Sequence, residues 1–304
     1  MKIISLLPSA TEIVYALGLG EHLYGVSFEC DFPVAARSVP VVSGTALPTD
    51  GSLSAQEIDA EVSARVAAGE SIYTLDDARI RDIDPDLILA QDLCQVCAVP
   101  SGAVEEALHV IGCHADVVSL DPGRLDEVIG CIGLVGAATG TTARADALME
   151  SLRARVDAVR TRVEGRDRPK VLVLEWSDPP FNAGHWVPDM VEAAGGTPVL
   201  AVAGARSRRL VWEEIVTEPI DLTVFMPCGF DLDGAVAQSS KLLSRPDAAG
   251  LGSIFAVDAN AYFSRPGPRV VDGVELLAGL LHPPDTGWVP SGARLLRTAD
   301  GSRR

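Results

Sequence analysis

The feature that most constrains the fold is a short pattern that occurs in both halves of the chain. In the first half, an apolar run begins at Asp86, Cys94 follows it, and the next apolar run ends at Asp121. The same three features recur 135, 134 and 137 positions later, at Asp221, Cys228 and Asp258. An almost constant offset over three features predicts two similar units.

Apolar, β-branched runs alternate with helical patterns along most of the chain. Strands are predicted at 2–7, 24–27, 86–90, 116–119, 171–175, 221–226 and 254–257. Helices are predicted near 54–68, 102–111, 123–137, 186–194, 232–243 and 268–281. A short helix should also begin at Ser9, with Glu12 completing a capping box, and stop at Gly18. This alternation predicts an α/β fold with parallel sheets in two Rossmann-like lobes.

One long amphipathic helix is predicted between the two repeats. Its apolar residues recur every three or four positions, at Leu148, Leu152, Val156, Val159 and Val163. Charged residues cover much of the rest of its surface, which is typical of a helix with one packed face. A single helix of this length would be a stiff connector.

The predicted organisation follows from this helix and the repeat. It consists of an N-terminal lobe over 1–141, the connecting helix over 142–164, a C-terminal lobe over 165–284 and a tail over 285–304. The tail is rich in Pro, Gly, Ser and Arg, so we expect it to add little to the fold.

The chain is strongly acidic, with a net charge of −17 over 304 residues. Such a charge argues against nucleic acid or an anionic membrane surface as a partner. No run of about 18 apolar residues is present, so no membrane span is expected. Pro8 interrupts the first apolar run, which is too short for the apolar core of a signal peptide. We therefore expect a cytoplasmic protein whose six cysteines are reduced thiols or metal ligands.

Three cysteines and one histidine are candidates for a metal site. Cys94 and Cys97 form a CxxC pair, whose spacing suits two thiolate ligands on one metal; a redox pair and simple packing are the alternatives. Cys228 takes the matching place in the second repeat, and His185 follows the predicted strand at 171–175. We expect Cys94, Cys97, Cys228 and His185 to hold a transition metal, zinc or iron.

Other polar and aromatic residues follow predicted strands, at the edge of a parallel sheet where ligands bind. Glu175 to Trp186 would offer aromatic surface to a large flat ligand, and the Glu29–Asp31 run is either part of the site or a polar turn. The ligand-binding residues predicted in this way are Glu29, Cys30, Asp31, Asp92, Glu175, Trp176, Phe181, Trp186, Tyr262, Phe263 and Arg265.

Several motifs resemble the cobalamin-binding substrate-binding proteins of ABC importers, the class with a helical backbone. They lie, in order, at 4–12, 25–27, 31–33, 85–88, 179–181, 194–196 and 265–269. The resemblance implies a helical-backbone metal receptor of the periplasmic binding protein type, with one helix bridging two α/β lobes. It implies ligand contacts at Pro8, Ser9, Glu29, Cys30, Asp31, Phe181, Tyr262 and Phe263.

The chain departs from that family at two positions. Ala78 stands where the family often has a Glu that docks on the permease, which argues against docking to an ABC permease. Tyr262 stands where the family has a Trp that lies against cobalamin. The chain also looks similar to a group of cytosolic relatives.

Two main functions fit the sequence, and both have a small molecule as partner. The first is a cytosolic binding protein for cobalamin or another metal chelate, held in a cleft between the lobes. The second is a metal-dependent enzyme with zinc or iron held by Cys and His. A metal or redox sensor that works through its cysteines is a third, weaker hypothesis.

Overall fold

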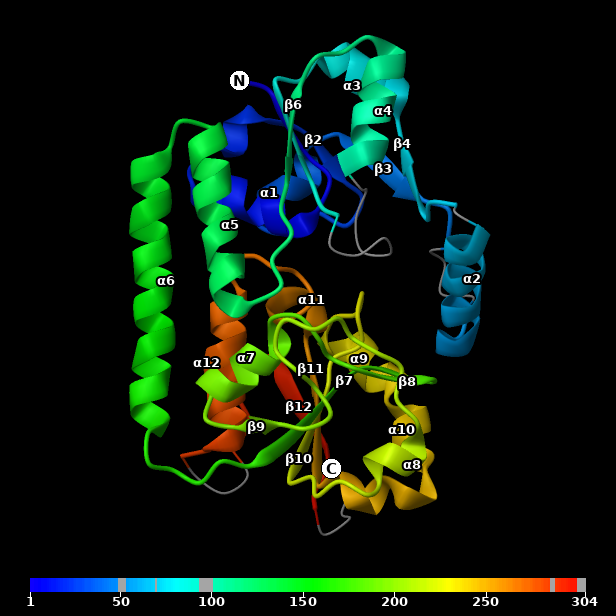
Figure 1. Ribbon diagram of the computed structural model, residues 1–304, viewed down its shortest axis with the longest axis vertical. Coiled ribbons are helices and arrows are strands. Elements are labelled where there is room, and N and C mark those ends of the chain that lie inside the picture. Colours follow the sequence, from blue (N-terminus) through cyan, green and yellow to red (C-terminus); the bar gives the residue numbers. More distant parts are fainter. Residues whose placement is uncertain (49–52, 69, 93–100, 285–287, 300–304) are drawn as a thin grey trace. The chain divides into compact units, whose positions relative to one another are not determined.

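A computed structural model of the chain contains two compact α/β units (Figure 1). The first unit comprises Met1–Pro122 and Val128–Glu150, and the second comprises Gly123–Glu127 and Ser151–Arg304. The predicted two-lobed α/β architecture is confirmed. The residues that the structure describes are 1–48, 53–68, 70–92, 101–284 and 288–299.

The first unit is built on a six-stranded sheet in the order β4-β3-β2-β1-β5-β6. All neighbours in it are parallel except β3 and β4. Its strands are β1 (Ile3–Ser5), β2 (Leu23–Ser27), β3 (Val41–Thr45), β4 (Tyr73–Leu75), β5 (Leu87–Ala90) and β6 (Asp116–Ser119). Every residue of β1 and β5 is buried, as expected for central parallel strands covered on both faces.

The second unit has its own sheet, in the order β12-β11-β10-β7-β8, with β9 also paired to β7. β7, β10 and β11 run parallel, whereas β8 and β12 are antiparallel to their neighbours. The strands are β7 (Lys170–Ser177), β8 (Pro180–Asn182), β9 (Thr197–Pro198), β10 (Leu222–Phe225), β11 (Ser253–Val257) and β12 (Ala293–Arg297).

Helices pack on the sheets. They are α1 (Pro8–Ala16), α2 (Ala55–Ala68), α3 (Asp77–Ile83), α4 (Ser101–Ile111), α5 (Leu125–Ala138), α6 (Thr142–Val163), α7 (Val187–Ala193), α8 (Trp212–Ile215), α9 (Leu232–Gln238), α10 (Ser240–Ser244), α11 (Ala259–Tyr262) and α12 (Val270–Leu281). Single 3₁₀ turns cover Gly20–His22, Val34–Ser38 and Pro246–Leu251. In the second unit, α7 and α12 lie on one side of the sheet and α8 to α10 on the other (Figure 1).

The repeat seen in the sequence is confirmed by the two sheets. β5 lies between β1 and β6, and β10 lies in the same place between β7 and β11. Each of these strands is fully buried, because its short apolar run is covered on both faces.

α6 forms where the apolar spacing predicts a helix. In the second unit Leu152, Val156, Val159 and Val163 are buried along one face of it. Arg155 lies beside this face and pairs with two carboxylates of α12, Asp272 and Glu275. These ion pairs tie the second half of α6 to α12.

Two expectations about chain ends and helix starts are wrong. The segment after 285 contributes β12, which pairs with β11 and buries Leu296, so it adds to the sheet. The first helix begins at Pro8 rather than after Ser9, and its N-cap, Leu7, makes no side-chain capping hydrogen bond. Pro8 takes the first helical position, where its missing N–H would have had no partner within the helix.

No helix within the described ranges is both long and apolar enough to cross a bilayer.

Candidate functional site

In the first unit, the turn after β2 places the Cys30 side chain among buried hydroxyl groups. Thr11 Oγ1 lies 3.1 Å from its sulfur and Ser27 Oγ lies 3.2 Å from it. The side chain is only 5% exposed. Pro8 and Ser9, at the start of α1, are buried too. These three predicted contacts therefore lie beneath the surface of the turn.

The same turn presents two aromatic rings that the sequence analysis missed. Phe28 is 38% exposed and Phe32 is 44% exposed, whereas the predicted contacts Glu29 and Asp31 are half-buried. The Phe28 ring lies 6.3 Å from the ring of Tyr73 in β4. Aromatic residues placed directly after the end of a parallel strand were the available signal.

Asp92 follows β5, but its carboxylate caps a helix. It accepts hydrogen bonds from the backbone N–H and hydroxyl of Ser101, at the start of α4, and from the hydroxyl of Ser119. Burial raises the pKa of Asp92, but these hydrogen bonds outweigh it and leave the pKa below its usual value. Its structural role is to hold the start of α4 near the end of β6.

In the second unit, three side chains form a row across adjacent strands near the carboxyl end of β7. Trp176 of β7 is directly opposite Phe181 of β8, and Phe181 is bridged on its other side to Arg209. Directly opposite residues of antiparallel strands project to the same face. The Arg209 guanidinium lies 5.6 Å from the centre of the Phe181 ring, a cation–π distance. We call Trp176, Phe181 and Arg209 the β8 row.

Further groups lie next to the β8 row. The Phe230 ring is 6.1 Å from the Trp176 ring, and the backbone N–H of Cys228 donates to the Glu175 carbonyl. The exposed Cys228 sulfur lies 3.6 Å from the Ser264 hydroxyl. The structure thus brings together Glu175, Trp176, Phe181 and Cys228, all singled out from the sequence. Phe230, Arg209 and Ser264 were missed, because pairing between distant segments places them there.

Two predicted contacts lie in the core instead. Phe263 is 0% exposed and Trp186 is 6% exposed, and the Trp186 indole N–H donates to the Phe263 carbonyl. The neighbouring Tyr262 is half-buried and packs against Gly292, where an added Cβ would lie 2.6 Å from its ring. Their contacts join the start of α7 to the end of α11, and the end of α11 to the segment before β12.

Asp258 follows β11, at the strand end that the repeat predicts, but it was not predicted as a site residue. Its carboxylate caps α11 by accepting from the N–H of Ala261. Burial raises the pKa of Asp258 above its usual value, against the favourable fields of Arg269 and the predicted contact Arg265. Arg265 is half-buried, and its positive charge stabilises the ionised form of this carboxylate.

His185 lies between β8 and α7 with a left-handed backbone, at φ 52°. Its backbone N–H donates to Ala205, and its Nε2 is buried with no hydrogen-bond partner in the described part of the chain. Burial, and then the positive charge of Arg206, lower its pKa, so the imidazole is held neutral. A neutral imidazole is the form that could ligate a metal.

Only two of the four predicted metal ligands, His185 and Cys228, lie among the described residues. Cys94 and Cys97 lie outside the described residues. Among the residues that are described, no three His, Cys, Asp or Glu side chains gather closely enough to hold a metal ion. His185 and Cys228 therefore remain predictions as ligands.

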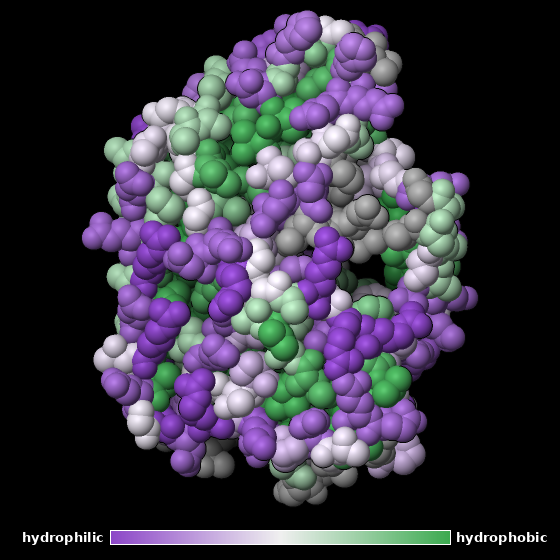
Figure 2. Space-filling model, in the orientation of Figure 1, coloured by the Kyte–Doolittle hydropathy of each residue, from purple (hydrophilic) through white to green (hydrophobic). Residues whose placement is uncertain are grey.

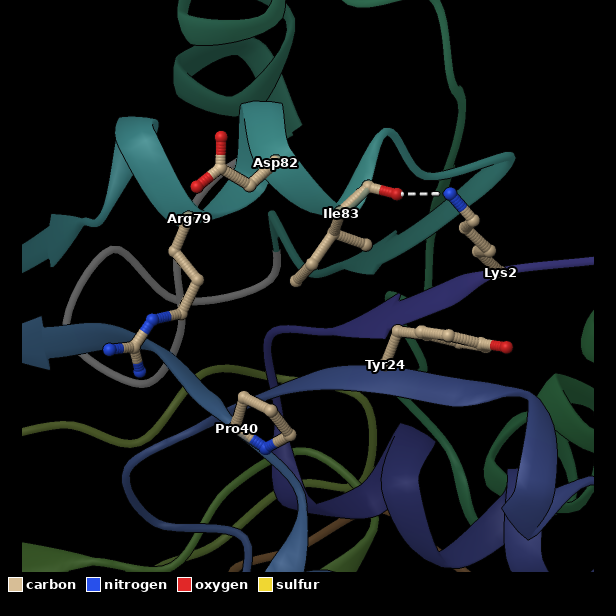
Figure 3. Close-up of a pocket in the computed structure, with 6 residues that line it drawn as sticks. All are labelled: Lys2, Tyr24, Pro40, Arg79, Asp82 and Ile83. Carbon is tan, nitrogen blue, oxygen red and sulfur yellow. Dashed lines mark hydrogen bonds between the residues drawn. The ribbon is translucent and has the colours of Figure 1, made fainter.

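A separate shallow pocket of about 570 Å³ lies in the first unit, where β1 and β2 begin (Figure 3). Lys2, Tyr24, Pro40, Arg79, Asp82 and Ile83 line it. Its two cationic groups have partners, since Lys2 Nζ donates to the Ile83 carbonyl and Arg79 to the Val41 carbonyl. It lies at the amino ends of these strands, away from the edge where ligands of such sheets bind.

A family model described as "Periplasmic binding protein" matches residues 3–253. This chain belongs to that family. It is 24% identical over 291 residues to an uncharacterised ABC transporter substrate-binding lipoprotein of Bacillus subtilis, covering 93% of this chain and 80% of the relative. It is 26% identical over 289 residues to a cobalamin-binding protein of Halobacterium salinarum, covering 92% and 69%.

A solved structure shares the fold of this chain. A periplasmic heme-binding protein from Pseudomonas aeruginosa superposes with a TM-score of 0.71 at 18% identity, covering all of this chain and 98% of that one. This likeness confirms the fold class expected from the motifs.

The expectation of a cytoplasmic protein is wrong. Relatives of this chain are a lipoprotein and periplasmic proteins, which work outside the cytoplasm. The expectation rested on the first apolar run, but that run forms β1 of the first sheet and carries no information about where the protein works.

Proposed function

We propose that this protein is the substrate-binding component of an ABC importer, and that its ligand is cobalamin or a related flat metal chelate such as heme. The β8 row carries the proposal. It offers an indole, a phenyl ring and a guanidinium on one face near the carboxyl end of a parallel strand, and flat conjugated ligands pack on such groups.

Two further features support this ligand class. The cobalamin-binding relative from Halobacterium salinarum matches over 92% of the chain, so its ligand is a natural candidate here. The exposed rings of Phe28 and Phe32, at the carboxyl end of β2, are a second aromatic group of the kind a flat ligand needs. The permease partner is proposed from the name of the Bacillus relative, although Ala78 lacks the carboxylate often used for docking.

Titration with hydroxocobalamin and with hemin tests the proposal. Both absorb visible light, so binding gives a spectral shift as well as heat. We expect at least one of them to bind with a Kd of about 1 μM or tighter, or about −8 kcal/mol. A flat calorimetric trace and an unchanged spectrum with both ligands would contradict the proposal.

The alternative of a metal-dependent enzyme is tested on the same sample. Metal analysis of protein purified without chelators would show stoichiometric zinc or iron if Cys and His residues hold a metal. The described residues give no separate observation in favour of that alternative.

A further inference from the structure

The shallow pocket of the first unit contains a tyrosine that an irregularity in β2 turns outward. Leu23 and Gly25 pair with successive residues of β1, so Tyr24 between them has no counterpart in that strand. A strand residue without a counterpart forms a bulge, which re-aims its side chain and is common beside functional sites. Tyr24 is 44% exposed, whereas the other four residues of β2 are buried. The bulge therefore presents the ring at the surface.

Two further apolar side chains, Pro40 and Ile83, line the pocket with Tyr24 (Figure 3). Pro40 comes directly before β3, and its carbonyl accepts from the N–H of Val26 in β2 at 3.0 Å. Ile83 is the last residue of α3. Hydrophilic side chains predominate on the face that Figure 2 draws. An apolar surface with charged groups around it is typical of a ligand-binding groove.

Lys2 supplies hydrogen-bond donors at one side of the pocket. Its Nζ donates to the Ile83 carbonyl at 2.6 Å. That bond uses one of the three N–H donors of the ammonium group. The carboxylate of Asp86 accepts from the backbone N–H of Lys2, and within the described residues the Lys2 ammonium has no ion pair of its own. Two donors and one positive charge are therefore available to a ligand.

Asp82 supplies the opposite charge. The other cation of the pocket, Arg79, is offset by Asp76, whose carboxylate lies 3.5 Å from the Arg79 Nε. Asp82 is exposed, and in the part of the chain that the structure describes its carboxylate has no hydrogen bond or ion pair. Figure 3 shows Lys2 and Asp82 on opposite sides of Ile83. The pocket thus presents one cation and one anion, with apolar surface between them.

We propose that this pocket binds a small aromatic amino carboxylate, a zwitterion with a carboxylate at one end of a ring and an ammonium at the other. The carboxylate accepts hydrogen bonds from Lys2, the ring packs on Tyr24 and Pro40, and the ammonium pairs with Asp82. The volume of about 570 Å³ is within the usual range of small-molecule sites. A zwitterion has no net charge, so the net charge of −17 on the protein does not repel it.

This site is independent of the proposed function. It lies at the amino ends of strands in the first unit, whereas the β8 row belongs to the second unit. Either site can therefore be disproved without the other.

The first test compares three ligands on the wild-type protein. The probe is para-aminomethylbenzoate; para-methylbenzoate lacks its ammonium, and para-methylbenzylamine lacks its carboxylate. NMR titration gives the Kd values, and the amide shifts should lie in β2 and at the end of α3. We expect a Kd of about 1 mM or tighter for the zwitterion, and binding weaker by about threefold or more for each of the others. No saturable binding, equal affinities for all three, or shifts only outside the pocket would each overturn the proposal.

The second test removes the two charges of the pocket separately. Lys2→Met and Asp82→Asn are compared with matched controls, Lys170→Met in β7 and Asp77→Asn, which is on α3 but does not line the pocket. We expect each pocket variant to weaken the zwitterion about threefold or more, and each control to change its Kd by less than about 1.5-fold. Asp82→Asn should leave the affinity for para-methylbenzoate unchanged, because that ligand has no ammonium.

Thermal unfolding midpoints show whether the variants are folded. Lys2→Met also removes a hydrogen bond to the end of α3, so if it does not fold, Asp82→Asn and the ligand series decide the question. Wild-type affinity for the zwitterion in a folded Lys2→Met or a folded Asp82→Asn overturns the proposal. Titration of the same variants with hydroxocobalamin and hemin should give wild-type results, which keeps this test separate from that of the proposed function.

Discussion

His185 shows how a single residue can be constrained by its backbone as well as by its side chain. Its φ of 52° lies in the left-handed region, where Asn is tolerated and β-branched residues are strained. We expect His185→Val to destabilise the protein by about 1–2 kcal/mol more than His185→Asn. Urea unfolding of the two variants measures the difference. Equal stabilities would show that the backbone conformation does not limit this position.

The same imidazole should make the protein sensitive to acid. Burial and Arg206 lower the pKa of His185, and burial and Arg166 lower that of His282. Below pH ~6.5 these two histidines are protonated in the unfolded chain but remain neutral in the folded protein. The free energy of unfolding therefore falls as the pH drops towards the pKa of the folded state. We expect His185→Gln to reduce this loss between pH 7 and 5, measured by urea unfolding at several pH values.

At the residue scale, the sequence predicted where residues lie along the strands better than it predicted whether their side chains are exposed for binding. Trp176, Phe181 and Cys228 do follow or end strands as expected. Trp186 and Phe263 also follow predicted strands, yet both are buried, and the indole N–H of Trp186 donates a hydrogen bond to the Phe263 carbonyl. A pattern along the chain gives the level of an aromatic residue in a sheet but not whether a later segment will cover it. Arg209 was missed because its pairing with Phe181 joins segments 28 positions apart.

At the element scale, α6 is stabilised by the ion pairs of Arg155. Its guanidinium donates to Asp272 and Glu275 of α12, and its pKa is raised first by the hydrogen bond to Glu275. A bidentate pair that is partly shielded from water is worth about 1 kcal/mol, near the upper end for surface pairs. We expect Arg155→Met to lower the free energy of unfolding by about that amount.

The control for this prediction lies on the same helix. Arg160 pairs with Asp157 one turn away, and both side chains are more than half exposed. Arg160→Met should cost less than about 0.5 kcal/mol. Equal losses in the two variants would mean that the contact with α12 adds nothing beyond helix-surface electrostatics.

Gly184 links the stability of an element to the β8 row. A Cβ at this position would lie 2.3 Å from the backbone nitrogen of Ser207, which must then move. We expect Gly184→Ala to displace the backbone at 205–207, lower stability and weaken ligand binding together, measured by urea unfolding and titration. Gly130→Ala in α5 meets no atom within 4 Å and removes a helix-interior glycine, so it should stabilise by about 0.5–1 kcal/mol. A Gly184→Ala variant with wild-type affinity would show that the backbone at 205–207 does not influence ligand binding.

Long periodic elements were predictable and short ones were not. The apolar stripe of α6 and the buried runs of β5 and β10 carry their own signal. β8 has three residues, and it is a strand because β7 and the segment at 208–210 pair with it on both sides. β12 is also a strand because it pairs with a distant segment, β11, so the sequence alone predicted it as part of a polar tail.

At the scale of the whole molecule, charge and composition describe the folded lobes and not where they work. The net charge of −17 and the predicted absence of a membrane span apply equally to a protein on either side of a membrane. The location was corrected only by comparison with relatives.

The last prediction concerns the stability of the loaded protein. A ligand that binds only the folded chain stabilises it by RT ln(1 + [L]/Kd), about 2.7 kcal/mol at 100 times Kd. With hemin or hydroxocobalamin, whichever titration shows to bind, the urea midpoint should rise with the logarithm of ligand concentration. Arg160→Met lies outside the β8 row and should show the same rise. A midpoint that stays constant while titration reports binding would mean that the ligand binds the unfolded chain as well, and not a site formed by folding.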